Sequence, residues 1–250
     1  MEIYYYLIKF KIFLPVIKLI SFLFKNETNF KTKDYIYQVP LNFDPISKFL
    51  MKFDLYEKKE RVMLQKMLDN TDIIEAGAGI GLISMYLKKK AKNKKLIMIE
   101  PNQKMNNLIH NNFNINKFNL DELEILNYAL SDSEKEKVEF QTYESDMANT
   151  ISNQALDYNF KKKNVDYVDT ISLNYIIEKY QIKNFQLVLD IEGEEINVIK
   201  KNNAWLDKCA SILLENHLPK KDLNELNSYI LNKGFSLIDK KENVFLFIKS

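Results

Sequence analysis

The sequence predicts an α/β fold: a doubly wound, mostly parallel sheet of seven strands, with helices between the strands and an antiparallel hairpin at the C-terminus. Three observations support this fold class. From residue 72 onward, apolar runs of strand length alternate with segments whose apolar residues recur at helical spacing. Three of the chain's five glycines follow the first of these runs directly. The last two runs, residues 235–239 and 244–248, are close enough in sequence to pair as a hairpin.

Apolar runs mark the expected strands, and turn residues mark where several of them end. The runs cover residues 72–76, 95–100, 123–130, 186–193, 210–217, 235–239 and 244–248. Pro101 stops the second strand and Pro219 follows the fifth, because proline has no backbone N–H to continue a ladder. Gly234 ends the helix before the hairpin. Strands that alternate with helices and right-handed crossovers produce a doubly wound sheet.

The segments between these strands are the expected helices. They cover residues 82–87, 103–113, 171–180, 194–200 and 222–232, and one or two more helices are expected over residues 46–68. Residues 137–160 interrupt the alternation and predict an excursion from the core, with a short strand at residues 138–142. Loops that recognise a substrate usually lie in such excursions, because a rigid scaffold can position them.

Composition fits one large globular domain and excludes several kinds of protein. The 250 residues carry 36 basic and 34 acidic side chains, and the net charge of +2 gives no general attraction to nucleic acid. Arg61 is the only arginine, so the chain has few side chains that could make bidentate contacts with phosphate or guanine. Cys209 is the only cysteine, which excludes internal disulfides and fits a reducing compartment. We therefore expect a cytoplasmic protein without a nucleic-acid partner.

The first 45 residues read as an apolar helical leader and an irregular arm, separate from the domain at residues 46–250. Residues 3–25 are strongly apolar, but lysines interrupt them and Pro15 would kink a helix, so they do not form an uninterrupted membrane span. Three lysines spaced seven apart would share one side of a helix: Lys11, Lys18 and Lys25. Such a helix can make peripheral contact with an anionic membrane. Packing against the domain or a partner subunit is an equally good interpretation.

The glycine cluster predicts a ligand site. Gly77, Gly79 and Gly81 follow a buried strand and precede a helix, where glycine lets the backbone turn tightly and approach a ligand. A dinucleotide-binding loop has the spacing G-x-G-x-x-G, but Leu82 stands where its last glycine should be. The run that begins at Glu75 reads E-x-G-x-G-x-G, a form typical of enzymes that use S-adenosylmethionine. An NAD-dependent oxidoreductase on a related sheet is the alternative.

A carboxylate in the next strand strengthens the prediction of a nucleoside. Glu100 ends the second apolar run, nineteen residues beyond Gly81. A carboxylate at this place can accept hydrogen bonds from both ribose hydroxyls of a nucleoside. Since open parallel sheets bind ligands at the carboxyl ends of their strands, we expect residues 127–129 to border the adenine.

The ends of the fourth and fifth strands carry further candidates. Asp190 and Glu192 should stand beside the cleft, whereas Glu194 and Glu195 are explained by their place at a helix N-terminus.

His217, at the end of the fifth strand, is the candidate general base, because histidine titrates near neutrality. A structural hydrogen-bonding role is the alternative for this histidine. Asp190 is expected near the methionine end of the cofactor. With Glu192 and Glu215 it could also offer oxygen ligands to magnesium, but the pattern is too loose to favour this, and we predict no metal.

Together these segments resemble the FkbM family of S-adenosylmethionine-dependent methyltransferases, over residues 56–249. The similarity is carried by Tyr56-Glu57, Glu75–Gly81, Met98–Asn102, Ala129–Asp132, Thr170–Leu173, Leu189–Gly193 and Leu214–His217. The family usually has aspartate where this chain has Glu75, which keeps the charge but adds a methylene. The resemblance implies a Rossmann-like class I methyltransferase fold, with S-adenosylmethionine as the cofactor.

The resemblance also implies which residues bind the cofactor and what the acceptor is. The cofactor-binding residues would be Glu57, Glu75, Gly77, Ala78, Gly79, Ile80, Glu100, Pro101, Asn102, Ala129 and Asp190. On spacing alone, Glu57 would instead lie on an exposed, charge-paired helix face. The implied reaction is O-methylation of a hydroxyl on a sugar, a glycan or a small natural product, with His217 and Asp190 as the catalytic residues. A non-catalytic scaffold held at a membrane is a further alternative.

Overall fold

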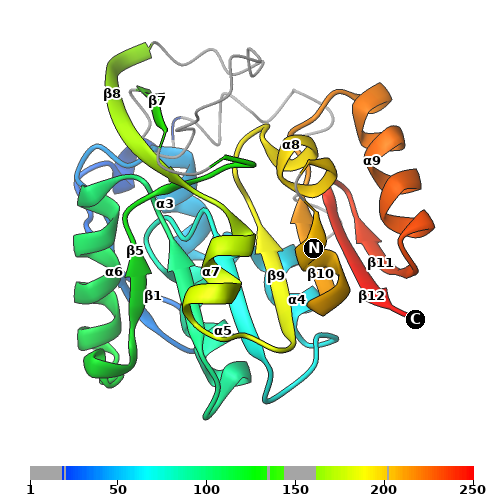
Figure 1. Ribbon diagram of the computed structural model, residues 1–250. Coiled ribbons are helices and arrows are strands. Elements are labelled where there is room, and N and C mark those ends of the chain that lie inside the picture. The colour runs from blue at the N-terminus through cyan, green and yellow to red at the C-terminus, as the bar shows by residue number, and fades with distance from the viewer. Residues whose placement is uncertain (1–18, 20, 134–135, 144–161, 202) are drawn as a thin grey trace.

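A seven-stranded sheet runs through the middle of the molecule, and helices cover both of its faces (Figure 1). The structure is a computed structural model, which describes residues 19, 21–133, 136–143, 162–201 and 203–250. The strand order is β11-β12-β10-β9-β3-β4-β5. This arrangement confirms the predicted α/β fold and its number of strands.

The central strands of this sheet are parallel, and the C-terminal pair is antiparallel. The parallel strands are β3 (Asp72–Ala76), β4 (Leu96–Ile99), β5 (Glu124–Leu126), β9 (Phe185–Leu189) and β10 (Cys209–Glu215). The closing hairpin consists of β11 (Phe235–Lys241) and β12 (Val244–Lys249), and β12 pairs with β10. The chain builds outward from β3 in one direction, through β4 and β5, and later places β9 on the other side of β3. The order therefore reverses beside β3, which is where such sheets bind ligands.

Side chains that alternate along the strands divide the core into two halves. In β4, Ile97 and Ile99 face one half, whereas Leu96 and Met98 face the other. The first half is covered by α7 (Leu173–Lys179), α8 (Glu195–Lys200) and α9 (Lys220–Asn232), and the second by α3 (Pro45–Lys52), α4 (Lys58–Leu64), α5 (Leu82–Ala91) and α6 (Gln103–Ile115). Because both faces of the strands are buried, the strands read as continuous apolar runs in the sequence.

The prediction of an irregular arm after the leader, within the first 45 residues, is wrong. This segment contains a hairpin of β1 (Asn29–Lys31) and β2 (Ile36–Gln38), which pairs in antiparallel register. Tyr37 is fully buried in the half of the core formed with α5 and α6. The amide of Asn112 in α6 accepts the backbone N–H of Gln38 at 2.6 Å and donates to its carbonyl at 3.1 Å. The alternation is hard to read in the sequence because Ile36, an apolar residue, is exposed.

The predicted third strand over residues 123–130 is two strands. β5 belongs to the main sheet, whereas β6 (Ala129–Leu130) pairs with β8 (Lys162–Ile171), which also pairs with β7 (Lys137–Tyr143). The chain leaves the main sheet at Asn127, whose amide donates to the carbonyls of Glu100 at 3.1 Å and Pro101 at 2.7 Å. β6, β7 and β8 form a separate sheet, of which β7 and one end of β8 are seen at the upper left of Figure 1. The predicted excursion begins with β7.

The predicted leader lies mostly outside the described residues. Of residues 3–25, the structure describes a short 3-10 helix, η1 (Phe22–Phe24), and a few neighbours. The helical leader, its membrane contact and the domain boundary at residue 46 therefore stay predictions. In the part of the chain that the structure describes, none of the helices is both long and apolar enough to span a membrane.

Candidate active site

A cleft opens at the carboxyl ends of β3, β4 and β9, beside the point where the strand order reverses. The empty space in and in front of it, open solvent included, is about 1240 Å³. Its walls come from the glycine loop (residues 77–81), from the ends of the central strands and from the start of α4. Phe43, which follows the N-terminal hairpin, also lines it. The cleft therefore lies where the sequence predicts the ligand.

One glycine in the loop is required by packing, a second is tightly packed, and a third leaves room for a ligand. Gly77, Gly79 and Gly81 all have positive φ, at +85°, +53° and +80°. A Cβ on Gly77 would lie 1.7 Å from the carbonyl oxygen of Asp190, and one on Gly81 would lie 3.3 Å from the side chain of Ile109. A Cβ on Gly79 would meet nothing within 4 Å. The loop thus packs closely against the end of β9 while one of its residues faces open space.

Glu100 stands at the end of β4 and ties the glycine loop to the start of α6. Its Oε2 accepts the backbone N–H of Gly79 at 2.9 Å, and its Oε1 accepts the N–H of Asn102 at 2.8 Å. Burial raises the pKa of Glu100 to about 7, although these two N–H groups oppose the shift. Each carboxylate oxygen has a second lone pair. Both oxygens can therefore accept a ribose hydroxyl as well.

Glu75, in β3, offers the cleft an acceptor atom that the protein does not satisfy. The residue is 3% exposed and lines the cleft, and burial raises its pKa to about 8. Its Oε2 is buried and has no hydrogen-bond partner among the described residues. An unsatisfied buried polar atom costs about 1–3 kcal/mol, so a ligand that donates to it gains this energy. The amino group of the methionine part of S-adenosylmethionine is such a donor.

Glu57 lines the cleft just before α4 rather than standing on an exposed helix face. Its φ of +48° is left-handed, which costs a residue other than glycine about 1–2 kcal/mol. Arg61 holds this turn: it forms an ion pair with Asp54 at 2.6 Å and donates to the carbonyl of Tyr56 at 3.1 Å. Burial, together with neighbouring Glu60, raises the pKa of Glu57 well above its usual value. Backbone strain maintained by the surrounding structure is common at functional sites.

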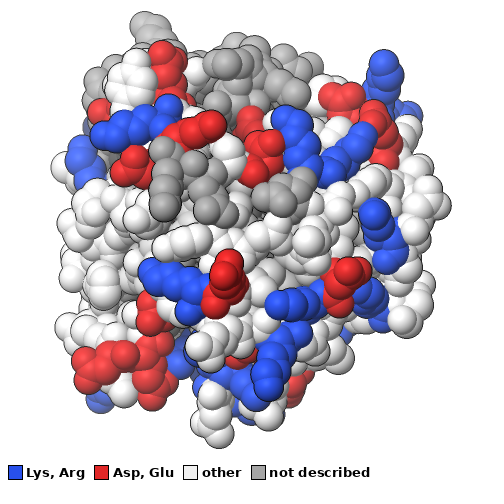
Figure 2. All heavy atoms as spheres, in the orientation of Figure 1, with Lys and Arg blue, Asp and Glu red and all other residues white. Residues whose placement is uncertain are grey.

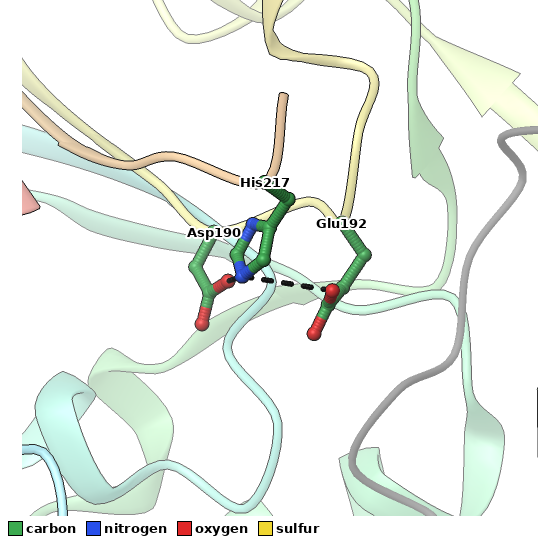
Figure 3. Close-up of side chains that lie close together, drawn as sticks. All are labelled: Asp190, Glu192 and His217. Atoms are coloured by element: carbon green, nitrogen blue, oxygen red, sulfur yellow. Dashed lines mark ion pairs between the residues drawn. The ribbon is translucent and has the colours of Figure 1, made fainter. Parts of the chain in front are cut away.

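His217 and four carboxylates form a compact group, here called the histidine cluster (Asp190, Glu192, Glu195, Glu215 and His217). The Nδ1 atom of His217 lies 3.1 Å from Oε1 of Glu195, a fully buried carboxylate. The Nε2 atom lies 3.6 Å from Glu192, 3.7 Å from Asp190 and 3.8 Å from Glu215. Figure 3 shows the side chains of Asp190 and Glu192 pointing toward the imidazole from either side. Asp190 also lines the cleft, so the cluster adjoins it.

The carboxylates set the charge of the imidazole. Burial opposes a charged ring, but the hydrogen bond with Glu195 and the charges of Asp190 and Glu192 outweigh it and raise the pKa of His217 to about 10. Burial also raises the pKa values of Asp190 and Glu192 above their usual range, while the imidazole opposes this. Without a ligand, the imidazole therefore carries a proton at neutral pH. It can act as a base only after it has lost that proton.

The structure brings most of the predicted site residues to one cleft. Those that line it are Glu57, Glu75, Gly77, Ala78, Gly79, Ile80, Glu100, Pro101, Ala129 and Asp190. Asn102 and His217 are not in its lining. Asn102 caps α6, because its side chain accepts the N–H of Lys104 at 3.0 Å, and it supports Glu100 through its own N–H. His217 lies against Asp190 within the cluster.

Two residues that contribute to the site were not predicted from the sequence. Glu195 is explained by the helix dipole in the sequence, yet it is completely buried against His217. Its spacing to Val198 and Ile199, three and four residues later, places it on the buried face of α8, and this was the available signal. Phe43 lies in the segment that was predicted to be irregular; the buried Tyr35, Tyr37 and Val39 alternate before it, but the apolar Ile36 between them obscures this signal.

Known proteins resemble this chain in sequence and in fold. A family profile, described as the methyltransferase FkbM domain, matches residues 75–237. No curated protein matches the chain. A putative tRNA methyltransferase from Streptococcus pneumoniae is 8% identical over 77% of this chain and 70% of that chain, with a TM-score of 0.45. A precorrin-6y methyltransferase from Geobacter metallireducens is 13% identical over 78% and 88%, also with a TM-score of 0.45. TrmK of M. capricolum, in complex with S-adenosylhomocysteine, is 12% identical over 76% and 66%, with a TM-score of 0.41.

Proposed function

The chain belongs to the FkbM methyltransferase family, and from this premise we propose that it methylates a hydroxyl oxygen of a sugar, a glycan or another small hydroxylated acceptor. Residues 75–237, which the family profile matches, include the glycine loop, Glu100 and the whole histidine cluster. The chain is a methyltransferase, and its cofactor is S-adenosylmethionine. An NAD-dependent oxidoreductase, the alternative on sequence grounds, does not agree with this family.

The observation that carries the choice of acceptor is the histidine cluster beside the cleft. Asp190, Glu192 and Glu215 line the cleft, so carboxylate oxygens border the space that an acceptor would enter. An ionised carboxylate only accepts hydrogen bonds, and a hydroxyl-rich molecule offers several donors. A sugar or a glycan therefore matches the cluster better than an apolar acceptor, which would bring no donors to these carboxylate oxygens.

Nucleic acid is a poorer match to this surface. Arg61, the only arginine, is held in the turn before α4 by Asp54 and by backbone carbonyls, so it is not free to bind phosphate. On the face drawn in Figure 2, basic and acidic side chains are interspersed and form no single basic stripe. Binding of nucleic acid without sequence preference depends on such a stripe.

The protein's part in the reaction is to hold the cofactor and align the acceptor. Glu100 would accept the ribose hydroxyls, Glu75 would accept the methionine amino group, and the open side of Gly79 would leave room for the backbone to approach the cofactor. Bound S-adenosylmethionine supplies a methyl group on a sulfonium, so that a C–O bond forms to the acceptor oxygen, the C–S bond breaks with its electron pair going to sulfur, and the hydroxyl proton leaves. Alignment alone can lower a barrier by about 7–11 kcal/mol in favourable cases.

The hydroxyl proton needs an acceptor, and we assign this role to the pair of Asp190 and His217. Asp190 is the member of the pair that lines the cleft, and the Nε2 atom of His217 lies 3.7 Å from its Oδ1. A charged imidazole stabilises the carboxylate before the reaction, and a neutral one can take the proton onward. General acid–base assistance of this kind typically increases a reaction rate by roughly 10²–10⁴-fold.

The test is to follow the methyl group. The purified full chain is incubated with S-adenosylmethionine carrying a ¹³C-labelled methyl group and with a panel of sugars, oligosaccharides and hydroxylated natural products. Carbon NMR then distinguishes a methyl on oxygen from one on nitrogen or carbon. An O-methyl product that is lost in Asp190→Asn and kept in His110→Gln supports the proposal. Methyl transfer only to nitrogen or carbon atoms, or cofactor binding without transfer to any acceptor, would overturn it; the second result would favour a scaffold.

The proposal places the reaction in the cytoplasm. Cys209 is a free, buried thiol, which agrees with a reducing compartment. Peripheral membrane contact through residues 3–25 remains part of the proposal. Sedimentation of the full chain with anionic vesicles, compared with a chain that lacks these residues, would test it.

A further inference from the structure

We infer that Asp190, Glu192 and His217 form a binding site for one divalent cation, with Glu195 as the residue that positions the histidine (Figure 3). The spacing of these residues in the sequence is too loose to indicate a metal, and the inference replaces the prediction that there is none. Binding of the ion stands on geometry alone. Its role in presenting the acceptor hydroxyl rests on the proposed function.

The ligand atoms are spaced as around an ion. One ligand atom from each of Asp190, Glu192 and His217 lies within 4.8 Å of the other two. The Nε2 atom of His217 is 3.6 Å from an oxygen of Glu192 and 3.7 Å from one of Asp190, both longer than a hydrogen bond. Atoms bound to one ion at about 2.0–2.2 Å lie roughly 3.0–3.6 Å apart. The observed separations are thus close to those of neighbouring ligands and, although within the range of ion pairs, too long for direct hydrogen bonds.

The histidine is held in the orientation that a metal ligand needs. Its side chain is 7% exposed, and its Nδ1 atom is hydrogen-bonded at 3.1 Å to Glu195, which is fully buried. With the proton on Nδ1, the lone pair lies on Nε2, which faces the carboxylates. Histidines that bind metals usually donate their other N–H to a carboxylate or a carbonyl in this way, which fixes the tautomer and the direction of the ring.

An unsatisfied oxygen is directed at the same place. The Oδ1 atom of Asp190 is buried and makes no hydrogen bond within the described part of the chain, and it is the atom that lies 3.7 Å from Nε2. Four carboxylates surround a single imidazole, so the ring alone cannot form a hydrogen bond with each of them. A divalent ion would supply the missing partner of the Asp190 Oδ1 atom.

The ligand set favours one class of metal. Two carboxylates and an imidazole suit divalent ions of the first transition series better than magnesium, which prefers oxygen ligands and retains several waters. Three protein ligands leave positions open for water or for a substrate oxygen. Because Asp190 and Glu192 line the cleft, an acceptor hydroxyl can occupy such a position. With Nε2 on the ion, the hydroxyl proton goes to the carboxylate of Asp190, so the pair of Asp190 and His217 accepts it through Asp190 alone.

Manganese is a suitable probe, because its electron spin reports nitrogen ligands. The chain has only two histidines, His217 and His110, and His110 is an exposed residue of α6, so His110→Gln is a matched control. The experiment uses untagged full-length protein, since a histidine tag would itself bind manganese. Binding of Mn²⁺ is measured by equilibrium titration without cofactor or acceptor. Electron spin echo modulation then detects coordinated imidazole nitrogen in the wild type, in His110→Gln and in His217→Gln.

The expected result is one Mn²⁺ per chain, with nitrogen modulation in the wild type and in His110→Gln. In His217→Gln the modulation should disappear, and the affinity should fall by at least tenfold. Absence of saturable binding, or bound Mn²⁺ without nitrogen modulation in the wild type, would overturn the inference. The wild-type and His110→Gln spectra decide the matter even if His217→Gln does not fold. The wild-type protein is also titrated with S-adenosylmethionine, which separates the two proposals. If the protein binds Mn²⁺ but not S-adenosylmethionine, the proposed function fails and the metal site stands.

Discussion

Replacing Gly77 by alanine should destabilise the protein, whereas replacing Gly79 should mainly weaken cofactor binding. A Cβ on Gly77 would lie 1.7 Å from the carbonyl oxygen of Asp190, although such contacts are essentially never under 3.0 Å, so the end of β9 would have to move by more than 1 Å. Overpacking of this kind costs about 1–3 kcal/mol. The left-handed backbone at φ +85° adds about 1–2 kcal/mol. The expected loss of stability is therefore about 2–5 kcal/mol.

Gly79→Ala is the matched control, because it has the same chemical change in the same loop. Its Cβ would meet nothing within 4 Å, so the expected loss of stability is only the cost of about 1–2 kcal/mol for a left-handed backbone at a residue other than glycine. The added methyl would occupy cleft space, and the affinity for S-adenosylmethionine should fall at least tenfold. Urea unfolding followed by circular dichroism, without ligand, measures stability, and calorimetric titration measures affinity. If Gly77→Ala is as stable as Gly79→Ala, the close approach of the loop to β9 is wrong.

Other substitutions test other parts of the structure. Glu100→Ala should weaken S-adenosylmethionine binding by about 10–100-fold in a calorimetric titration, because hydrogen bonds to a charged group contribute about 1.5–3 kcal/mol. Glu178→Ala, at an exposed site, is the control. Unchanged affinity in Glu100→Ala would contradict the ribose contact. Burial raises the pKa of Glu75 from 4.5 to about 8, so the folded protein holds a proton that the unfolded chain releases, and stability falls by about 1.4 kcal/mol per pH unit across that range. Urea titrations should show a smaller fall for Glu75→Gln, and equal slopes would count against this burial. Lys48 is buried and donates to two backbone carbonyls, at 2.7 and 2.8 Å. Lys48→Met should therefore lower the free energy of unfolding by about 1–3 kcal/mol in a urea titration, whereas Lys52→Met, on the exposed side of α3, should lower it little. Equal losses in the two variants would refute this role of Lys48.

The main sheet and the glycine loop could be predicted because they follow from local rules. Strands buried on both faces are mostly apolar, so their positions are readable without knowing their neighbours. The loop at residues 77–81 and Glu100 were predictable because a tight turn and a distal carboxylate appear at a fixed spacing in the sequence. The C-terminal hairpin was predictable from its two apolar runs and the short turn between them.

The features that were missed depend on contacts between distant residues. The N-terminal hairpin is stabilised by Asn112, which lies 74 residues beyond Gln38 and also donates to the carbonyl of Ile80 in the glycine loop. No local pattern around the hairpin indicates this partner. Glu195 is similar, since a glutamate in the first turn of a helix already has an adequate local explanation. Its spacing to Val198 and Ile199 indicates a buried helix face, but only its contact with His217, 22 residues later, shows that it belongs to the site.

The most direct test of the account is a crystal structure of the protein in complex with S-adenosylhomocysteine. We predict that the nucleoside lies over the glycine loop, with both ribose hydroxyls hydrogen-bonded to the carboxylate of Glu100. A nucleoside bound outside this cleft, or a Glu100 carboxylate that makes no contact with the ribose, would contradict it.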